Sequence, residues 1–194
     1  MTPRSNIIRE TEKFLLQYLA MPADYAFVAS LWTAMTHVWQ GLDVLPYFVI
    51  TSETKRSGKT MFGMDLLRPL SSNGEDISGM TASVLYRTME DSKPTLFVDE
   101  AEQLANGSAG NIRTTLNMGY KKGQTMKRTL PGGQVGEFAV FGPKCFILIG
   151  DVYDTLRDRS IVLRMRRASM EESRHLKRMV STTVDAETAD IGGR

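Results

Sequence analysis

Four short apolar segments dominate the pattern of hydrophobic and polar positions along the chain. They occupy residues 46–52, 94–99, 144–150 and 160–166, and polar or turn-forming residues bound each of them. Segments of this length that are apolar at successive positions are typical of strands buried on both faces of a parallel sheet. The pattern therefore predicts an α/β fold of three layers, in which a mostly parallel central sheet lies between helices.

Two helices are predicted before the first strand, at residues 5–20 and 23–41. Pro22 lies in the break between them, where it favours the start of the second helix. Apolar residues from Trp32 to Leu42 recur at helical spacing, which favours packing in the core over a role in binding.

Shorter elements are predicted between the first two strands and near the C-terminus. A polar connector at 71–79 precedes a helix that Thr81 or Ser83 caps and that runs to about Asp91. At the other end of the chain, residues 171–180 predict one amphipathic helix.

The polar stretch 181–194 contains no aromatic residue, and it predicts a disordered tail. We therefore divide the chain into an N-terminal helical segment (1–45), a core (46–168) and a partial helix with its tail (169–194).

Composition fits one globular domain, because 194 residues with 42% apolar and 24% charged side chains are enough to bury a core. The net charge is only +2, so any nucleic-acid site has to be a local basic patch. The single cysteine, Cys145, predicts a buried thiol and excludes an internal disulfide and a cysteine-cluster zinc site. No apolar run approaches the ~18 residues of a membrane span, and we expect a cytoplasmic protein.

The first apolar segment leads into a sequence typical of a phosphate-binding loop, Ser57-Gly58-Lys59-Thr60. A triphosphate needs backbone N–H groups that point at the phosphates, a lysine that reaches the β and γ oxygens, and a hydroxyl that holds Mg²⁺. Gly58, Lys59 and Thr60 supply them in that order. The predicted nucleotide-binding residues are Glu53, Thr54, Lys55, Arg56, Ser57, Gly58, Lys59, Thr60 and Met61.

One position of this loop departs from the usual pattern. The loop normally has glycine five positions before Gly58, and Glu53 stands there in this chain. Because Gly-Lys-Thr alone is common by chance, the loop by itself leaves nucleotide binding open.

The second apolar segment ends in two adjacent carboxylates, Asp99 and Glu100. In a P-loop enzyme one carboxylate at such a strand end belongs to the Mg²⁺ shell, and a second polarises the attacking water. We assign Asp99 to the first role and Glu100 to the second. The alternative is a strand end with two solvated acids. The pairing of this strand end with Gly-Lys-Thr favours a nucleoside triphosphatase.

The third segment is followed by Asp151 and by Leu156-Arg157-Asp158-Arg159, and the order of elements here resembles the AAA+ branch of P-loop ATPases. That resemblance implies a polar sensor after the third strand, for which Asp151 is the candidate. It also implies an arginine that reaches the neighbouring subunit's nucleotide, for which Arg159 is the better match and Arg157 the reserve. The alternative for these two arginines is a surface ion-pair cluster.

Most of residues 26–168 is similar to an uncharacterised P-loop domain family of phage, plasmid and bacterial proteins, often joined to primase or other replication modules. The matching segments are 31–37, 51–60, 95–101, 116–119, 141–144 and 154–160. That family tolerates a residue other than glycine at the position of Glu53. The resemblance implies a role in replication of a phage or mobile element.

Residues 119–133 combine glycines, one tyrosine and four cations, and they predict a hairpin with a basic face. In several AAA+ helicases a hairpin just before the sensor strand grips DNA. The candidate nucleic-acid-binding residues are Tyr120, Lys121, Lys122, Lys127 and Arg128. The alternative is a solvated turn with scattered lysines.

Together the motifs predict a Mg²⁺-dependent ATPase, with ATP and Mg²⁺ as cofactors and with Thr60 and Asp99 as metal ligands. The predicted catalytic residues are Lys59, Glu100, Arg159 and Arg157. We expect a ring or other homo-oligomer in a bacterial or phage-infected cell, with DNA and another replication domain or chain as further partners.

Two functions stay open for this ATPase. The first is a helicase-like or DNA-remodelling motor. The second is a nucleotide-dependent switch or assembly protein that acts on a protein partner with little turnover. Only about thirty residues follow the last predicted strand, which is short for an AAA+ helical lid.

Overall fold

The computed structural model describes residues 3–77, 80–102, 114, 116–129 and 132–192. Its centre is a five-stranded sheet in which all four strand pairings are parallel. The order of the strands is β2-β3-β6-β1-β7. The strands are β1 (Tyr47–Ser52), β2 (Gly74–Asp76), β3 (Thr95–Val98), β6 (Lys144–Ile149) and β7 (Ser160–Arg164).

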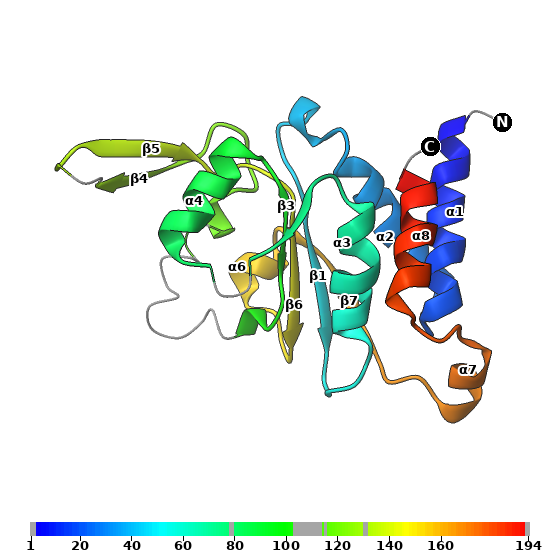
Figure 1. The fold of residues 1–194 in the computed structure, drawn as a ribbon. Helices are drawn as coiled ribbons and strands as arrows, with labels where there is room; N and C mark the ends of the chain where they lie inside the picture. Colours follow the sequence, from blue (N-terminus) through cyan, green and yellow to red (C-terminus); the bar gives the residue numbers. More distant parts are fainter. Residues whose placement is uncertain (1–2, 78–79, 103–113, 115, 130–131, 193–194) are drawn as a thin grey trace.

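Helices cover both faces of this sheet (Figure 1). The first group, which packs on one face, comprises α1 (Pro3–Tyr18), α2 (Ala23–Met35), η2 (Met61–Leu67), α3 (Arg68–Leu70) and α8 (Ser181–Gly192). The second group, on the other face, comprises α4 (Ala82–Asp91) and α6 (Asp154–Arg157). The predicted α/β architecture with a mostly parallel central sheet is confirmed.

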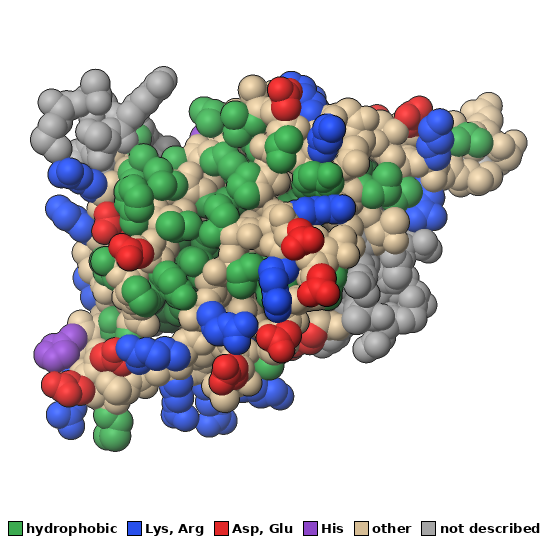
Figure 2. All heavy atoms as spheres, turned by 180° about the vertical axis from the view of Figure 1, so that it is seen from behind, with side chains coloured by type: hydrophobic (Ala, Val, Ile, Leu, Met, Phe, Trp, Pro, Cys, Tyr) green, Lys and Arg blue, Asp and Glu red, His purple; other side chains and the backbone are tan. Residues whose placement is uncertain are grey.

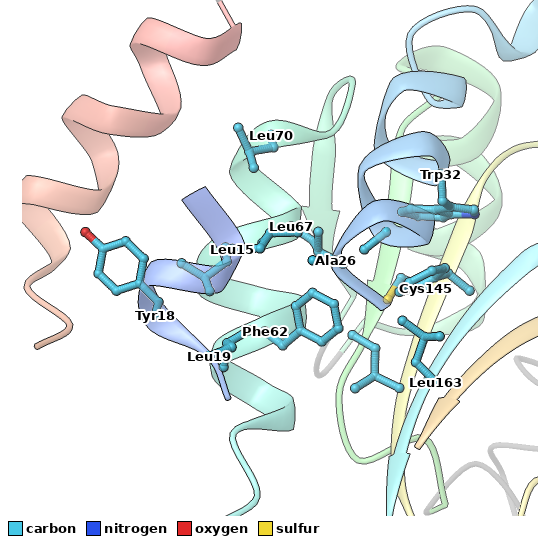
Figure 3. Close-up of a cluster of buried hydrophobic side chains, with 14 of the residues drawn as sticks. Leu15, Tyr18, Leu19, Ala26, Trp32, Phe62, Leu67, Leu70, Cys145 and Leu163 are labelled. Carbon is cyan, nitrogen blue, oxygen red and sulfur yellow. The ribbon is translucent and has the colours of Figure 1, made fainter. Parts of the chain in front are cut away.

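Alternate residues of the strands supply the two cores. Phe48 and Ile50 of β1 face the first group of helices, whereas Tyr47 and Val49 face the second. Figure 3 shows the first core, where side chains of α1, α2 and the η2–α3 helix point toward those of the strands. Cys145 lies fully buried there, as predicted. Because both faces are covered, the strands are apolar at nearly every position.

The boundaries of the four predicted strands agree with the structure to within two residues, but several other elements differ. The predicted helix 23–41 ends at Met35, and a short 3₁₀ turn, η1 (Trp39–Gly41), follows it. The predicted connector 71–79 contains β2, an edge strand that pairs with β3. This strand is short and polar, so its pairing partner, not its own pattern, makes it a strand.

The C-terminal prediction was wrong. The helix predicted at 171–180 is a short helix, α7 (Met170–His175), and the predicted disordered tail forms α8 over most of its length. Val184 and Thr188 of α8 are buried, and Tyr18 of α1 donates a hydrogen bond to Glu187 (Oη to Oε2, 2.9 Å). Tertiary packing therefore stabilises a helix whose sequence carries little signal of its own.

A two-stranded antiparallel hairpin, β4 (Thr125–Thr129) and β5 (Val135–Ala139), extends from one end of the molecule (Figure 1). The fully buried Lys144 connects its base to the sheet. The Lys144 Nζ donates to the carbonyls of Val140 (3.0 Å), Gly142 (3.0 Å) and Gly119 (3.4 Å), which lie before and after the hairpin. Gly119 is required there, because a Cβ would collide with the Val140 carbonyl and with Nζ.

We expect Lys144→Met to destabilise the protein by at least about 1–3 kcal/mol, because buried carbonyls lose their donor. Burial lowers the pKa of Lys144 from 10.5 to about 7. Between these values the unfolded chain binds a proton that the native state lacks, so the contribution of Lys144 to stability rises with pH, by up to about 1.4 kcal/mol per pH unit. Urea unfolding at pH 7 and pH 9 should therefore show a larger difference between wild type and variant at pH 9.

The exposed Lys13 provides the matched control, since Lys13→Met should change stability little at either pH. A difference for Lys144→Met that is the same at both pH values would contradict the assignment.

Candidate functional site: a loop and two acid-bearing strand ends

The placement of β6 between β1 and β3 aligns three strand ends at one edge of the sheet. Ser52, the last residue of β1, pairs with Ile149 of β6. Backbone and side-chain bonds then join Gly150 to β1: Gly150 N donates to Ser52 O (2.9 Å), and Thr51 Oγ1 donates to Gly150 O (2.5 Å). The predicted loop, the two acids and the predicted sensor therefore share the carboxyl edge of the sheet, where parallel α/β sheets bind ligands.

The loop between β1 and η2 contains two residues in the left-handed region, Arg56 (φ 62°) and Gly58 (φ 82°). Gly58 occupies a conformation that costs glycine little, and its carbonyl accepts the first helical bond, from Phe62 N (2.8 Å). The helix that follows is wide: Arg68 N reaches back to Gly63 O, a π-type bond. Backbone N–H groups at the start of this helix are available to an anion.

Lys59 lies at the centre of the site and is 7% exposed. Its Nζ donates to Ser52 Oγ at 2.7 Å and to Ser57 Oγ at 3.4 Å. Burial lowers the pKa of Lys59, while the carboxylates of Glu102 and Asp99 raise it. The Lys59 ammonium therefore bonds to hydroxyl oxygens, which are weaker partners than a phosphate, with negative charge nearby.

The two predicted acids follow β3 directly. Asp99 Oδ1 accepts from the backbone N–H of Glu100 (2.9 Å), which holds the carboxylate back over the turn. Glu100 has φ 51°, and its side chain is exposed. A non-glycine residue in this conformation is uncommon and is often found at functional sites.

Sequence reasoning missed Glu102, two positions further along the chain. Its Oε2 accepts a hydrogen bond from the backbone N–H of Ile149 (3.2 Å), so the carboxylate reaches from the end of β3 to the end of β6. The only sequence signal was a third acid in the run Asp99-Glu100-Ala101-Glu102, and the strand order was needed to give it a partner.

Arg164, at the end of β7, was also missed. Its guanidinium lies 3.6 Å from the carboxylate of Glu53 and 3.4 Å from that of Asp151. All three side chains are largely exposed, so the ion pairs contribute little stability. They do place the Arg164 cation between Glu53, the non-glycine position of the loop, and Asp151, the predicted sensor.

Two cavities border the loop. One, of about 370 Å³, lies between the α1–α2 corner and the end of β7, and its lining includes Tyr25, Glu53 and Met165. The other, of about 200 Å³, adjoins the first and is lined in part by Leu19, Gly58 and Met61. Apolar and aromatic side chains thus stand beside the loop.

The residues assigned to Mg²⁺ are Thr60, at the end of the loop, and Asp99, directly after β3. They lie at the same edge of the sheet, and the Thr60 side chain is exposed. Within the described ranges, no group of three His, Cys, Asp or Glu side chains is arranged to hold a metal ion by itself. Mg²⁺ bound to one or two carboxylates and to substrate phosphates does not need such a group, so these residues fit the ion.

The two arginine candidates lie at the opposite edge of the sheet. Arg159 O accepts from Tyr47 N at the start of β1, while the loop follows its end. The Arg159 guanidinium donates to Asn117 O (3.0 Å) and stacks on the Tyr120 ring (4.3 Å). Arg157 is exposed at the end of α6. Neither arginine is near its own loop, so a contact with nucleotide would have to occur in a neighbouring subunit.

The predicted basic hairpin begins later than expected. Tyr120, Lys121 and Lys122 precede β4 and lie against residues 43–45, where Leu45 N donates to Tyr120 O (2.9 Å). Lys122 Nζ also donates to Gln40 O (3.1 Å).

Two of the four cations do belong to the hairpin, on β4. Lys127 is exposed there, and the Arg128 guanidinium stacks over the Tyr86 ring of α4 at 5.1 Å. Of the four predicted cations, the hairpin therefore carries one that is exposed to solvent, Lys127, and the expected cluster of four is not formed there.

Comparison with known proteins gives no match, either to a family model or to a curated protein. The resemblance to P-loop ATPases therefore rests on the sequence motifs alone. None of the helices in the described part of the chain has the length and apolar character that crossing a bilayer requires.

We expect Arg159→Ala to lower the free energy of unfolding by about 1–3 kcal/mol, because the variant loses a charge-assisted bond to Asn117 O and the contact with Tyr120. Arg157→Ala, the matched exposed control, should change it by less than about 0.5 kcal/mol. Urea unfolding of the two variants measures both effects. Equal stability of the two would show that Arg159 does not support the segment before the hairpin.

Proposed function

We propose that this protein binds and hydrolyses ATP with Mg²⁺. The observation that carries the proposal is the buried Lys59 ammonium. Among the residues that the structure describes, its hydrogen-bond partners are the hydroxyls of Ser52 and Ser57. It belongs to a loop with two residues in the left-handed region, and the acidic residues after β3 share its edge of the sheet. A buried cation without a bonded carboxylate is costly unless a ligand supplies negative charge, and a triphosphate would do so.

In this proposal each group at the carboxyl edge has one task. Lys59 exchanges its bonds with Ser52 and Ser57 for bonds to the β and γ phosphate oxygens. The Thr60 hydroxyl and Asp99 would hold Mg²⁺, which would neutralise phosphate charge when it is bound. The exposed Glu100 carboxylate orients and polarises the water that attacks the γ phosphorus.

The cavities beside the loop suit the base and ribose of the nucleotide. Tyr25 and Met165 supply an aromatic ring and a polarisable side chain within one lining, next to loop residues Glu53 and Thr54. An aromatic ring and a thioether can both pack against a planar base, and the arginines of the same lining can contact the phosphates of the nucleotide.

The favoured use of the hydrolysis energy is a helicase-like or DNA-remodelling motor. The support is the hairpin that extends from the body just before β6, together with Arg157, which is exposed at the end of α6 where a neighbouring subunit could reach it. In a ring-shaped homo-oligomer, an arginine of one subunit would contact the nucleotide of its neighbour, and the hairpins of all subunits would belong to the same assembly.

A specific observation also favours the second candidate, an ATP-dependent switch for a protein partner. An apolar groove of about 540 Å³ lies between α1, α2 and the end of α8, with Leu31, Met35 and Val38 in its lining. Figure 2 shows hydrophobic side chains gathered over a broad area of the face seen from behind. Exposed apolar areas of this kind are typical of protein–protein contacts.

Lys59→Ala should abolish ATP binding, since the phosphates lose the cation of the loop. Glu100→Gln should keep binding and reduce hydrolysis by about 10²-fold or more, because an amide does not accept a proton from water. Titration with a fluorescent ATP analogue and a phosphate-release assay separate the two effects. Lys13→Ala, which removes an exposed lysine of α1 outside the loop, is the control for Lys59. Normal turnover in Glu100→Gln would remove Glu100 from the role of base.

If the motor reading is right, single-stranded DNA should stimulate ATP hydrolysis, and Lys121, Lys122 and Lys127 together should contact phosphates. Replacing all three with Gln should make the slope of log binding constant against log salt concentration less steep by about 2, because each phosphate contact contributes about 0.7. Basal hydrolysis should stay near that of wild type.

The control carries the same change of charge away from the hairpin, at the exposed positions Arg9, Lys13 and Arg174. Hydrolysis that no DNA stimulates, together with an unchanged salt slope, would favour the switch.

A further inference from the structure

Glu102 lies closer to the phosphate site than its position in the sequence suggests. Its carboxylate accepts the N–H of Ile149 (3.2 Å), Ile149 pairs with Ser52 on the adjacent strand, and Ser52 Oγ accepts from Lys59 Nζ (2.7 Å). Three consecutive contacts thus connect the carboxylate to the loop lysine across the ends of β6 and β1.

The electrostatic relation between the two side chains agrees with this geometry. Burial lowers the pKa of Lys59, and of the two carboxylates that raise it, Glu102 has a larger effect than Asp99. Glu102 is also half-buried, so solvent screens its charge less than that of the exposed Glu100.

We propose that Glu102 belongs to the nucleotide site and has two effects there. Its negative charge balances the charge of Lys59 while no nucleotide is bound, and it makes triphosphate binding depend on Mg²⁺. This inference rests on the proposed function, because it takes the phosphates to lie at Lys59. It assigns Glu102 a positioning role, through Lys59 and the end of β6, and leaves Glu100 as the residue that contacts water.

The physical reason is the charge that a triphosphate brings. When phosphate oxygens reach Lys59, they also come nearer to the Glu102 carboxylate, and two negative groups repel each other more strongly where the effective dielectric is low. If the acids and the phosphates shared a divalent cation, its charge would offset this repulsion. Without Mg²⁺, Glu102 should therefore oppose nucleotide binding.

Glu102→Gln tests the charge alone, because the amide oxygen still accepts the N–H of Ile149. We expect the variant to bind a fluorescent ATP analogue at least about tenfold more tightly than wild type in EDTA, and with similar affinity in excess Mg²⁺. The ratio of the two dissociation constants, which measures the Mg²⁺ dependence, should fall by the same factor. Binding, not turnover, is the readout.

Two further variants separate charge from fold. Glu102→Asp keeps the charge with a shorter reach to Ile149 N, and it should retain the Mg²⁺ dependence of wild type. Glu75→Gln removes a half-buried carboxylate on β2, whose hydrogen bond comes from Ser92 Oγ at 3.4 Å, and it should leave both affinities unchanged.

The outcomes distinguish the two proposals. If wild type and Glu102→Gln both bind ATP with the same Mg²⁺ dependence, or if Glu102→Asp loses that dependence, the role of Glu102 is overturned and the proposed function stands. If wild type binds no ATP in either condition, the proposed function fails as well.

Discussion

The hydrogen bonds that seat β6 between β1 and β3 are the constraint on which the rest of the structure depends. They set two distant parts of the chain side by side and so align three strand ends at the carboxyl edge. If β1 and β3 were direct neighbours, the end of β6 with Gly150 and Asp151 would not lie between the loop and the acids. Glu102 would then lack the Ile149 N–H as its hydrogen-bond donor. The candidate site is a product of this strand order more than of any one motif.

A lysine is buried at each end of the strands, and the two lysines differ in their hydrogen-bond partners. Lys144 has three backbone carbonyls as acceptors and connects the hairpin base to the sheet. Lys59 has two hydroxyls, with acids beyond them. Carbonyls fixed by the backbone cannot leave, whereas hydroxyl rotors can give way to a phosphate. The first arrangement suits permanent support and the second suits exchange with a ligand.

At the edge opposite the loop, four side chains converge on one short segment of backbone. Tyr47 and Arg159 donate to the carbonyls of Leu116 and Asn117, Tyr153 donates to the Asn117 side chain, and Lys144 donates to Gly119 O. This segment leads into the hairpin. Any movement of α6 and β7 at a subunit contact would therefore act on the base of the hairpin through hydrogen bonds already present. If the proposed motor function is correct, this link would connect a subunit contact with the hairpin.

The sequence by itself determined the four apolar strands, the α/β class and the position of the loop, since apolar runs and the Gly58-Lys59-Thr60 order depend on local chemistry alone. It did not determine β2 or α8, whose own residues carry little pattern and whose form depends on β3 and on α1 as partners. Nor did it determine the places of Glu102, Arg164 and Tyr120. Each of these side chains is defined by a contact across strands or segments more than ten residues apart, and only the tertiary fold sets such contacts, because they follow from strand order and not from spacing along the chain.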